Sequence, residues 1–134
     1  MTFDAGDPHR LARWWAALLG YEVEDGHDLI AGLLDSGIVT EADVVRIDGR
    51  LWFADAVAAH DPAGRGPRLF FQRVPEAKSA KNRIHLDIPV DPAELETEVA
   101  RAVELGAKFE EYRSHPGHRW AVMHDLEGNE FCLH

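Results

Sequence analysis

Two neighbouring stretches near the middle of the chain have the hydrophobic and polar patterns of β-strands. Residues 69–72 are mainly apolar and aromatic and are bounded by glycine and proline, which is typical of a buried strand. Residues 84–88 alternate strictly, with His85 and Asp87 on one face of the predicted strand. Its apolar face is predicted to carry Ile84, Leu86 and Ile88. A strand with an imidazole and a carboxylate on its polar face either faces water or lines a polar cavity.

Two helices are predicted from apolar residues at spacings of three and four, and each helix opens with an Asp-Pro pair and ends at a glycine. They occupy about 7–20 and 91–106, and Glu94 is placed to complete a capping box in the second. The order strand, Asp-Pro, helix, Leu-Gly and strand occurs at 2–23 and again at 84–109. This internal repeat indicates two copies of one supersecondary unit, each with the order β-α-β-β-β.

The segment between the two copies has a pattern of its own. We expect a short helix from about residue 28 to 36, followed by strands at 41–48 and 51–54. An Asp-Gly pair joins these two strands, which is a strong signal for a tight hairpin. Residues 55–67 contain proline and glycine and are predicted to be a loop that can open with a helical turn.

Three further strands are predicted in the second copy, at 109–112, 120–124 and 130–134. In the last strand, Phe131 and Leu133 share the apolar face. The opposite face carries Glu130, Cys132 and His134. Because the strands after each helix run consecutively, we predict an α+β fold in which helices cover the outer face of a curled sheet.

Composition narrows the possible partners and the compartment. The chain has 14 Lys and Arg against 24 Asp and Glu, so its net charge of −10 disfavours nucleic acid and anionic membranes as partners. No apolar run approaches the length of a membrane span, and the first residues lack the features of a signal peptide. Cys132 is the only cysteine, so the chain contains no disulfide framework. We therefore expect a cytoplasmic protein.

Four pieces of the sequence together resemble a known family. They are TFDAGDPHRLARWWAALLGYEV, FFQRVPEAKSAKNRIHLDI, ELGA and DLEGNEFCLH. The paired βαβββ layout resembles the vicinal-oxygen-chelate superfamily, which contains glyoxalase I, extradiol dioxygenases, and fosfomycin and bleomycin resistance proteins. More narrowly, the four pieces resemble the actinobacterial glyoxalase-like domain group.

The resemblance implies one domain over residues 1–134, built from a first module at about 1–76 and a second at about 83–134. Residues 24–66 match poorly and look like an insertion that replaces a shorter hairpin. In the superfamily the two modules form a cup-shaped mixed sheet with the helices outside, and the cup holds a small molecule. We expect such a small-molecule ligand here, and a homodimer.

The resemblance also implies metal ligands on four inner strands, which this sequence matches only in part. The first ligand would fall before Met1. His85 matches the histidine that opens the second module, Gln72 occupies the likely ligand position in the first, and Cys132 replaces the usual glutamate. The predicted metal ligands are therefore His85, Gln72 and Cys132, for one divalent ion (Zn, Ni, Mn or Fe) or none. An amide is a weak ligand and a thiolate favours softer ions.

Two of these side chains, His85 and Cys132, have both a functional and a structural interpretation. His85, oriented by Asp87, suits a metal ligand or a general base, or it is a cavity histidine satisfied by hydrogen bonds. Glu130 is the second catalytic candidate, and a cluster of Glu130, His85 and His124 would suit a divalent metal. Cys132 is a soft ligand, a nucleophile or a small buried core residue.

The predicted substrate-binding residues include Asp87 and five others. Trp52 and Trp120 are candidate walls of an apolar pocket. Gln72 can orient a substrate carbonyl, or it is a buried amide whose hydrogen bonds are made within the protein. Lys81 and Arg83 belong to a basic patch that either draws in a carboxylate or phosphate or pairs with acidic neighbours.

Three functions remain open at this stage. The first is a metal-assisted lyase or isomerase, in which a divalent ion polarises a carbonyl or stabilises an enediolate; a dioxygenase is less favoured. The second is a metal-independent binding or resistance protein that sequesters a drug or metabolite without catalysis. The third is a dimerising domain with no ligand. Sensitivity to a chelator separates the first from the second.

Overall fold

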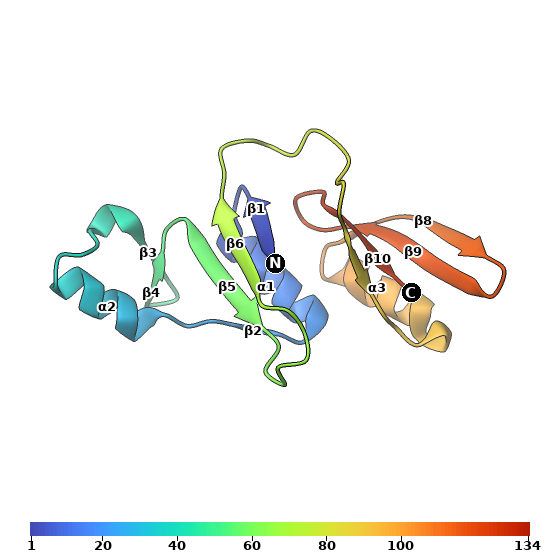
Figure 1. Cartoon of the computed structure of the whole chain (residues 1–134), viewed down its shortest axis with the longest axis horizontal. Helices are drawn as coiled ribbons and strands as arrows, with labels where there is room; N and C mark the ends of the chain where they lie inside the picture. The colour runs from blue at the N-terminus through green and yellow to red at the C-terminus, as the bar shows by residue number, and fades with distance from the viewer. The chain divides into compact units, whose positions relative to one another are not determined.

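Each half of the chain forms a four-stranded mixed sheet with one long helix, in a computed structural model that describes all residues 1–134 (Figure 1). The two compact units are Met1–Pro75 and Glu76–His134. The predicted α+β fold class is confirmed. No helix has the length and apolar character needed to cross a membrane.

The first unit has its strands in the order β1-β6-β5-β2, with β1 parallel to β6 and the other neighbours antiparallel. Its elements are β1 (Thr2–Ala5), α1 (Pro8–Leu19), β2 (Glu22–Val23), β5 (Ala56–His60) and β6 (Leu69–Arg73). Helix α1 begins as predicted, because the Asp7 carboxylate accepts a hydrogen bond from the Arg10 amide. It ends at Gly20, whose φ of 69° is the left-handed conformation that favours glycine.

Aromatic packing joins α1 to the sheet of the first unit. The Phe3 ring lies 4.9 Å from the Phe71 ring and 5.4 Å from the Trp15 ring, measured between centroids. Phe71 and Leu69 are completely buried. Burial of each such side chain contributes about 1.5–3 kcal/mol, so this layer is the main stabilising core of the unit.

The segment between β2 and β5 adds a small subdomain with its own core. It contains α2 (His27–Asp35), a 3₁₀ turn (Glu41–Asp43), β3 (Val44–Ile47) and β4 (Arg50–Phe53). Ile30, Val44 and Leu51 form its apolar cluster. The predicted hairpin is confirmed: the two residues of its turn have φ angles of 52° and 77°, as a tight turn between strands requires.

The prediction of a loop at 55–67 is wrong over its first part, which forms β5 between β6 and β2. The sequence of β5 is Ala-Val-Ala-Ala-His, and alanine has a low β-propensity. Ala58 and Ala59 are buried at 4% and 0% exposure, so packing against α1 and pairing on both edges override the local preference.

The second unit repeats the topology of the first, with its strands in the order β7-β10-β9-β8. Its elements are β7 (Leu86–Ile88), α3 (Leu95–Glu104), β8 (Lys108–His115), β9 (His118–His124) and β10 (Glu130–Leu133). Strand β7 is parallel to β10, and the remaining neighbours are antiparallel. The internal repeat seen in the sequence is thus a repeat of strand connectivity.

Two local predictions for the second unit are wrong. Ile84 precedes β7 and is 82% exposed, so it does not belong to the apolar face of that strand. The Asp91 carboxylate accepts from the Ala93 amide, and a 3₁₀ turn (Pro92–Glu94) precedes α3 in place of the predicted capping box. In contrast, Phe131 and Leu133 are buried as predicted.

Candidate functional site

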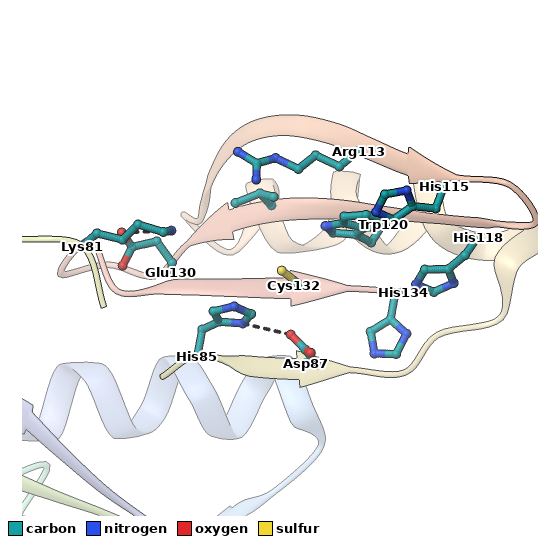
Figure 2. Close-up of a pocket in the computed structure, with 11 residues that line it drawn as sticks. Lys81, His85, Asp87, Arg113, His115, His118, Trp120, Glu130, Cys132 and His134 are labelled. Atoms are coloured by element: carbon teal, nitrogen blue, oxygen red, sulfur yellow. Dashed lines mark ion pairs between the residues drawn. The ribbon is translucent and has the colours of Figure 1, made fainter. Parts of the chain in front are cut away.

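A cavity of about 420 Å³ lies on the face of the second unit's sheet opposite to Phe131 and Leu133 (Figure 2). Its floor is formed by side chains of β7 and β10 and of the residues that adjoin them, His85 and His134, and its wall by side chains of β8 and β9. The alternation of β10 directs Glu130, Cys132 and His134 to this face, as the sequence predicts.

Three potential metal ligands meet at the floor of the pocket. His85 Nδ1 lies 2.9 Å from Asp87 Oδ1, and Asp87 is directly opposite Cys132 in the register of β7 and β10. The donor atoms of the three side chains all lie within 4.8 Å of one another. Figure 2 shows the His85 and Asp87 side chains turned toward one another beside the Cys132 sulfur. Residues that are distant in sequence are therefore grouped by strand pairing.

Cys132 is a buried thiol, with 8% of its surface exposed. Burial raises the pKa of this thiol, and the negative charge and hydrogen bond of Asp87 raise the pKa further. The free side chain is therefore a neutral thiol at neutral pH and a poor nucleophile. A cation bound between His85 and Asp87 would instead favour the thiolate.

Glu130 is held by basic residues at one end of the pocket. Lys78 Nζ lies 3.0 Å from one carboxylate oxygen and Lys81 Nζ 3.8 Å from the other, and the Asn82 amide donates to the carboxylate at 3.1 Å. Burial opposes ionisation, but the hydrogen bonds from Lys78 and from the Asn82 and Glu130 amides outweigh it and lower the pKa of Glu130 to about 2. Glu130 is therefore a permanently charged anchor near neutral pH, which does not suit a general acid.

Aromatic rings form the far wall of the pocket. The rings of His115 and His118 lie 5.6 Å and 5.4 Å from the Trp120 ring, and His134 packs edge-on against His118 at 5.3 Å. Arg113 also lines the pocket, and Glu111 holds its guanidinium through a hydrogen bond of 2.7 Å. Trp120 lines this pocket, and the wall is richer in imidazole than the apolar wall expected from the sequence.

The structure brings together six of the predicted site residues. They are His85, Asp87, Glu130, Cys132, Lys81 and Trp120. Arg83 is exposed and does not line the pocket. The predicted cluster with His124 is wrong, because His124 Nε2 lies 2.9 Å from a Glu110 carboxylate oxygen and the donor group at the floor does not include it.

Gln72 and Trp52 belong to the first unit. Gln72 donates a hydrogen bond of 2.8 Å to Asp4, which is its register partner in β1. This pair occupies the place in the first sheet that Cys132 and Asp87 occupy in the second. Trp52 lies in β4, with its ring 5.8 Å from the His9 ring. Neither side chain is part of the donor group around His85.

Three residues that line the pocket were not predicted from the sequence: Arg113, His115 and His118. Arg113 and His115 alternate on β8, and His115 is the register partner of His118 across the turn of the β8–β9 hairpin. This alternation is visible in the sequence once the hairpin register is known. The register was the missing information, because Phe109 and Glu111 flank an irregularity in the pairing.

The donor set fits a zinc-type ion. Imidazole, carboxylate and thiolate are the three ligand types of protein zinc sites, with bonds of about 2.0–2.3 Å. Three protein ligands leave a fourth position for water or substrate, which is the pattern of catalytic zinc. The thiolate makes the set less suitable for hard ions such as Mn²⁺.

The family description "Glyoxalase-like domain" matches the chain over residues 1–134. The chain belongs to the glyoxalase-like domain family. This family lies in the vicinal-oxygen-chelate superfamily, as the resemblance implied. No curated protein matches this glyoxalase-like chain.

Solved structures agree with the glyoxalase-like fold. The fosfomycin resistance protein FosX from Mesorhizobium loti is 16% identical with a TM-score of 0.64, over 100% of this chain and 86% of its own. A glyoxalase/bleomycin resistance protein/dioxygenase family enzyme from Burkholderia phytofirmans is 14% identical with a TM-score of 0.65, over 99% and 93%. A FosX variant from Listeria monocytogenes, in complex with Mn(II) and a dihydroxypropylphosphonic acid, is 12% identical with a TM-score of 0.63, over 99% and 84%. At these identities the likeness establishes the fold alone.

Proposed function

We propose that this glyoxalase-like protein is a metal-assisted lyase or isomerase that acts on a small organic molecule in the pocket of its second unit. The observation that carries the proposal is the group of His85, Asp87 and Cys132 at the floor of that pocket. The volume of about 420 Å³ falls within the range of about 300–1,000 Å³ that small-molecule sites occupy. A metal ion and a small polar ligand in the Listeria neighbour support the same use of the fold.

Each group in the pocket has a distinct role in this proposal. His85, Asp87 and Cys132 would hold a zinc-type ion, which would supply Lewis-acid catalysis to a substrate carbonyl. Asp87 orients the His85 ring through Nδ1, as carboxylates do for metal-bound histidines. His115 and His118 at the opposite wall supply imidazoles for proton transfer to the substrate. The Trp120 ring offers a flat apolar surface against which the substrate packs.

Metal analysis of variants tests this proposal. Protein purified without chelators should bind close to one zinc per chain by inductively coupled plasma mass spectrometry. His85→Ala and Cys132→Ala should both lose this metal. Gln72→Ala is the matched control: it removes another predicted ligand, in the first unit, and should keep the metal. Zinc far below one per chain, with no rise in melting temperature on addition of Zn, Ni, Mn or Fe, would reject the metal-assisted function.

The second candidate is a metal-independent protein that binds a drug or metabolite without catalysis. Two observations favour it. The His85 ring already has a partner in Asp87. The Cys132 thiol, whose pKa is raised, is neutral without a cation. In that case EDTA should change neither the melting temperature nor the affinity for a ligand found by screening. A loss of ligand binding on chelation would instead favour the enzyme.

We also propose that the protein is a homodimer in the cytoplasm. Size-exclusion chromatography with light scattering tests the assembly. A mass near twice the 15.0 kDa of one chain is expected, and a mass of one chain at micromolar concentration would reject the dimer.

A further inference from the structure

A second cavity, of about 660 Å³, lies in the first unit between the start of α1 and the β3–β4 hairpin. Two contacts hold the hairpin to the helix. His9 Nε2 lies 2.9 Å from the Phe53 carbonyl oxygen, and Arg13 Nη2 lies 3.3 Å from Asp48 Oδ2 in the hairpin turn. The inserted hairpin and the start of α1 therefore form the two walls of this cavity.

Three arginines line this cavity, although the chain as a whole is strongly acidic. Arg10 forms no ion pair. Arg73 donates to the Gly6 and Ala54 carbonyl oxygens at 2.5 Å and 3.3 Å, so its charge has no carboxylate partner. Arg13 pairs with Asp48, but the Asp48 side chain is 84% exposed, and such pairs are weak.

The remaining polar groups of the lining do not cancel this positive charge. Asp7 is the only carboxylate, and one of its oxygens accepts the Arg10 backbone amide at the start of α1. Burial lowers the pKa of His9 and outweighs the Phe53 hydrogen bond and the charge of Asp7, which raise it; the charges of Arg13 and Arg73 lower it as well. His9 is therefore neutral at neutral pH. Three guanidinium groups and one carboxylate therefore line the cavity, and Asp48, which pairs with Arg13, is not part of the lining.

The opposite wall is apolar and comes from the hairpin. Val44, Val45 and Ile47 line it, and all three are at least partly buried. A cavity of this volume is larger than a single inorganic anion needs and lies within the range of small-molecule sites. A fitting ligand has an anionic head for the arginines and an apolar body for the hairpin.

We propose that this cavity binds a small phosphomonoester, with its phosphate against Arg10, Arg13 and Arg73 and its organic group against Val45 and Ile47. Guanidinium groups bind phosphate through pairs of parallel, charge-assisted hydrogen bonds. The cavity lies entirely within the first unit, so the assignment does not depend on the function proposed for the second unit.

Calorimetric titration with inorganic phosphate and with phenyl phosphate tests the proposal. We expect saturable one-to-one binding, with the ester tighter than inorganic phosphate. Arg10→Gln should weaken both by about tenfold or more, since a hydrogen bond to a charged group contributes that much. Arg10 forms no ion pair and its side chain is exposed, so the variant should keep its fold, which circular dichroism can verify.

Arg65→Gln is the matched control, because it removes the same charge from an exposed side chain of the first unit that does not line the cavity. It should leave both affinities unchanged. Lys81→Gln, in the pocket of the second unit, should also leave them unchanged. Absence of saturable binding, equal affinity for the two anions, or a loss confined to Lys81→Gln would each overturn the proposal.

Discussion

Lys78 Nζ lies 3.0 Å from a carboxylate oxygen of Glu130, and the two side chains are only 20% and 9% exposed. This ion pair fastens the segment before β7 to the start of β10. It also explains why Glu130, which we expected to act in catalysis, has instead the contacts of a structural anchor.

Because the Lys78–Glu130 ion pair needs an ionised carboxylate, we expect the protein to lose stability in acid. The pKa of Glu130 is lowered from 4.5 to about 2, so its contribution is present above about pH 4.5 and is lost as the pH falls toward 2. We expect a decrease on the order of 2–3 kcal/mol in the free energy of unfolding between pH 5 and pH 2. Urea unfolding at a series of pH values measures it.

Glu130→Gln should reduce the pH dependence by about this amount, because the glutamine does not titrate; the part that comes from other carboxylates with a lowered pKa, such as Glu24 and Glu96, should remain. Glu104→Gln, at the end of α3, is an exposed control that should leave the dependence intact. If both variants follow the wild-type curve, the Lys78–Glu130 pair does not contribute to stability.

Asp87→Asn should weaken zinc binding at least 10- to 100-fold: this is the range found when a partner of a metal-bound histidine is removed, and here a proposed ligand is lost as well. Competition with a chromophoric chelator measures this change. Asp4→Asn is the matched control, since Asp4 occupies the corresponding position in the first sheet and bonds Gln72. Equal affinity in the wild type and in Asp87→Asn would show that Asp87 neither binds nor orients a ligand.

Alkylation of Cys132 reports directly on its environment, since it is the only cysteine. Burial and Asp87 raise the pKa of the thiol, so reaction with iodoacetamide at pH 7 should be slow compared with that of a small free thiol. Asp87→Asn should speed it, because loss of the negative charge lowers the pKa. Mass spectrometry follows the reaction, and a wild-type rate equal to that of the free thiol would contradict the prediction.

Gly66→Ala should destabilise the first unit, because a Cβ at this position would lie 1.8 Å from the Tyr21 hydroxyl oxygen. Overpacking of this kind costs about 1–3 kcal/mol. Gly32→Ala is the control: its Cβ would meet no atom within 4 Å, and in the interior of α2 alanine should stabilise by about 0.5–1 kcal/mol. Thermal unfolding distinguishes the two variants, and equal melting temperatures of Gly66→Ala and Gly32→Ala would contradict the close contact between residue 66 and Tyr21.

Local chemistry made part of this structure predictable. The Asp-Pro start and the glycine end of α1 encode the helix directly, and the strict alternation of β10 places Cys132 on the face opposite to Phe131. The pairing of His85 with Asp87 follows from the same alternation. These features depend on residues that are neighbours in sequence.

Features that depend on distant partners were missed. Strand β5 has an alanine-rich sequence and exists because β6 and β2 pair with it. Lys78 pairs with Glu130 only because the chain before β7 passes the start of β10. The histidines of the pocket wall depend on the register of β8 and β9, which an irregularity shifts.

The small core of Ile30, Val44 and Leu51 has a consequence for local motion. Because this cluster is separate from the layer of Phe3, Trp15 and Phe71, the subdomain of α2, β3 and β4 can open while the four-stranded sheet stays folded. Amide hydrogens of β3 and β4 should then exchange with solvent faster than those of β5 and β6. The wall that completes the arginine-lined cavity would thus be its most readily opened part, and a bound anion would slow that exchange.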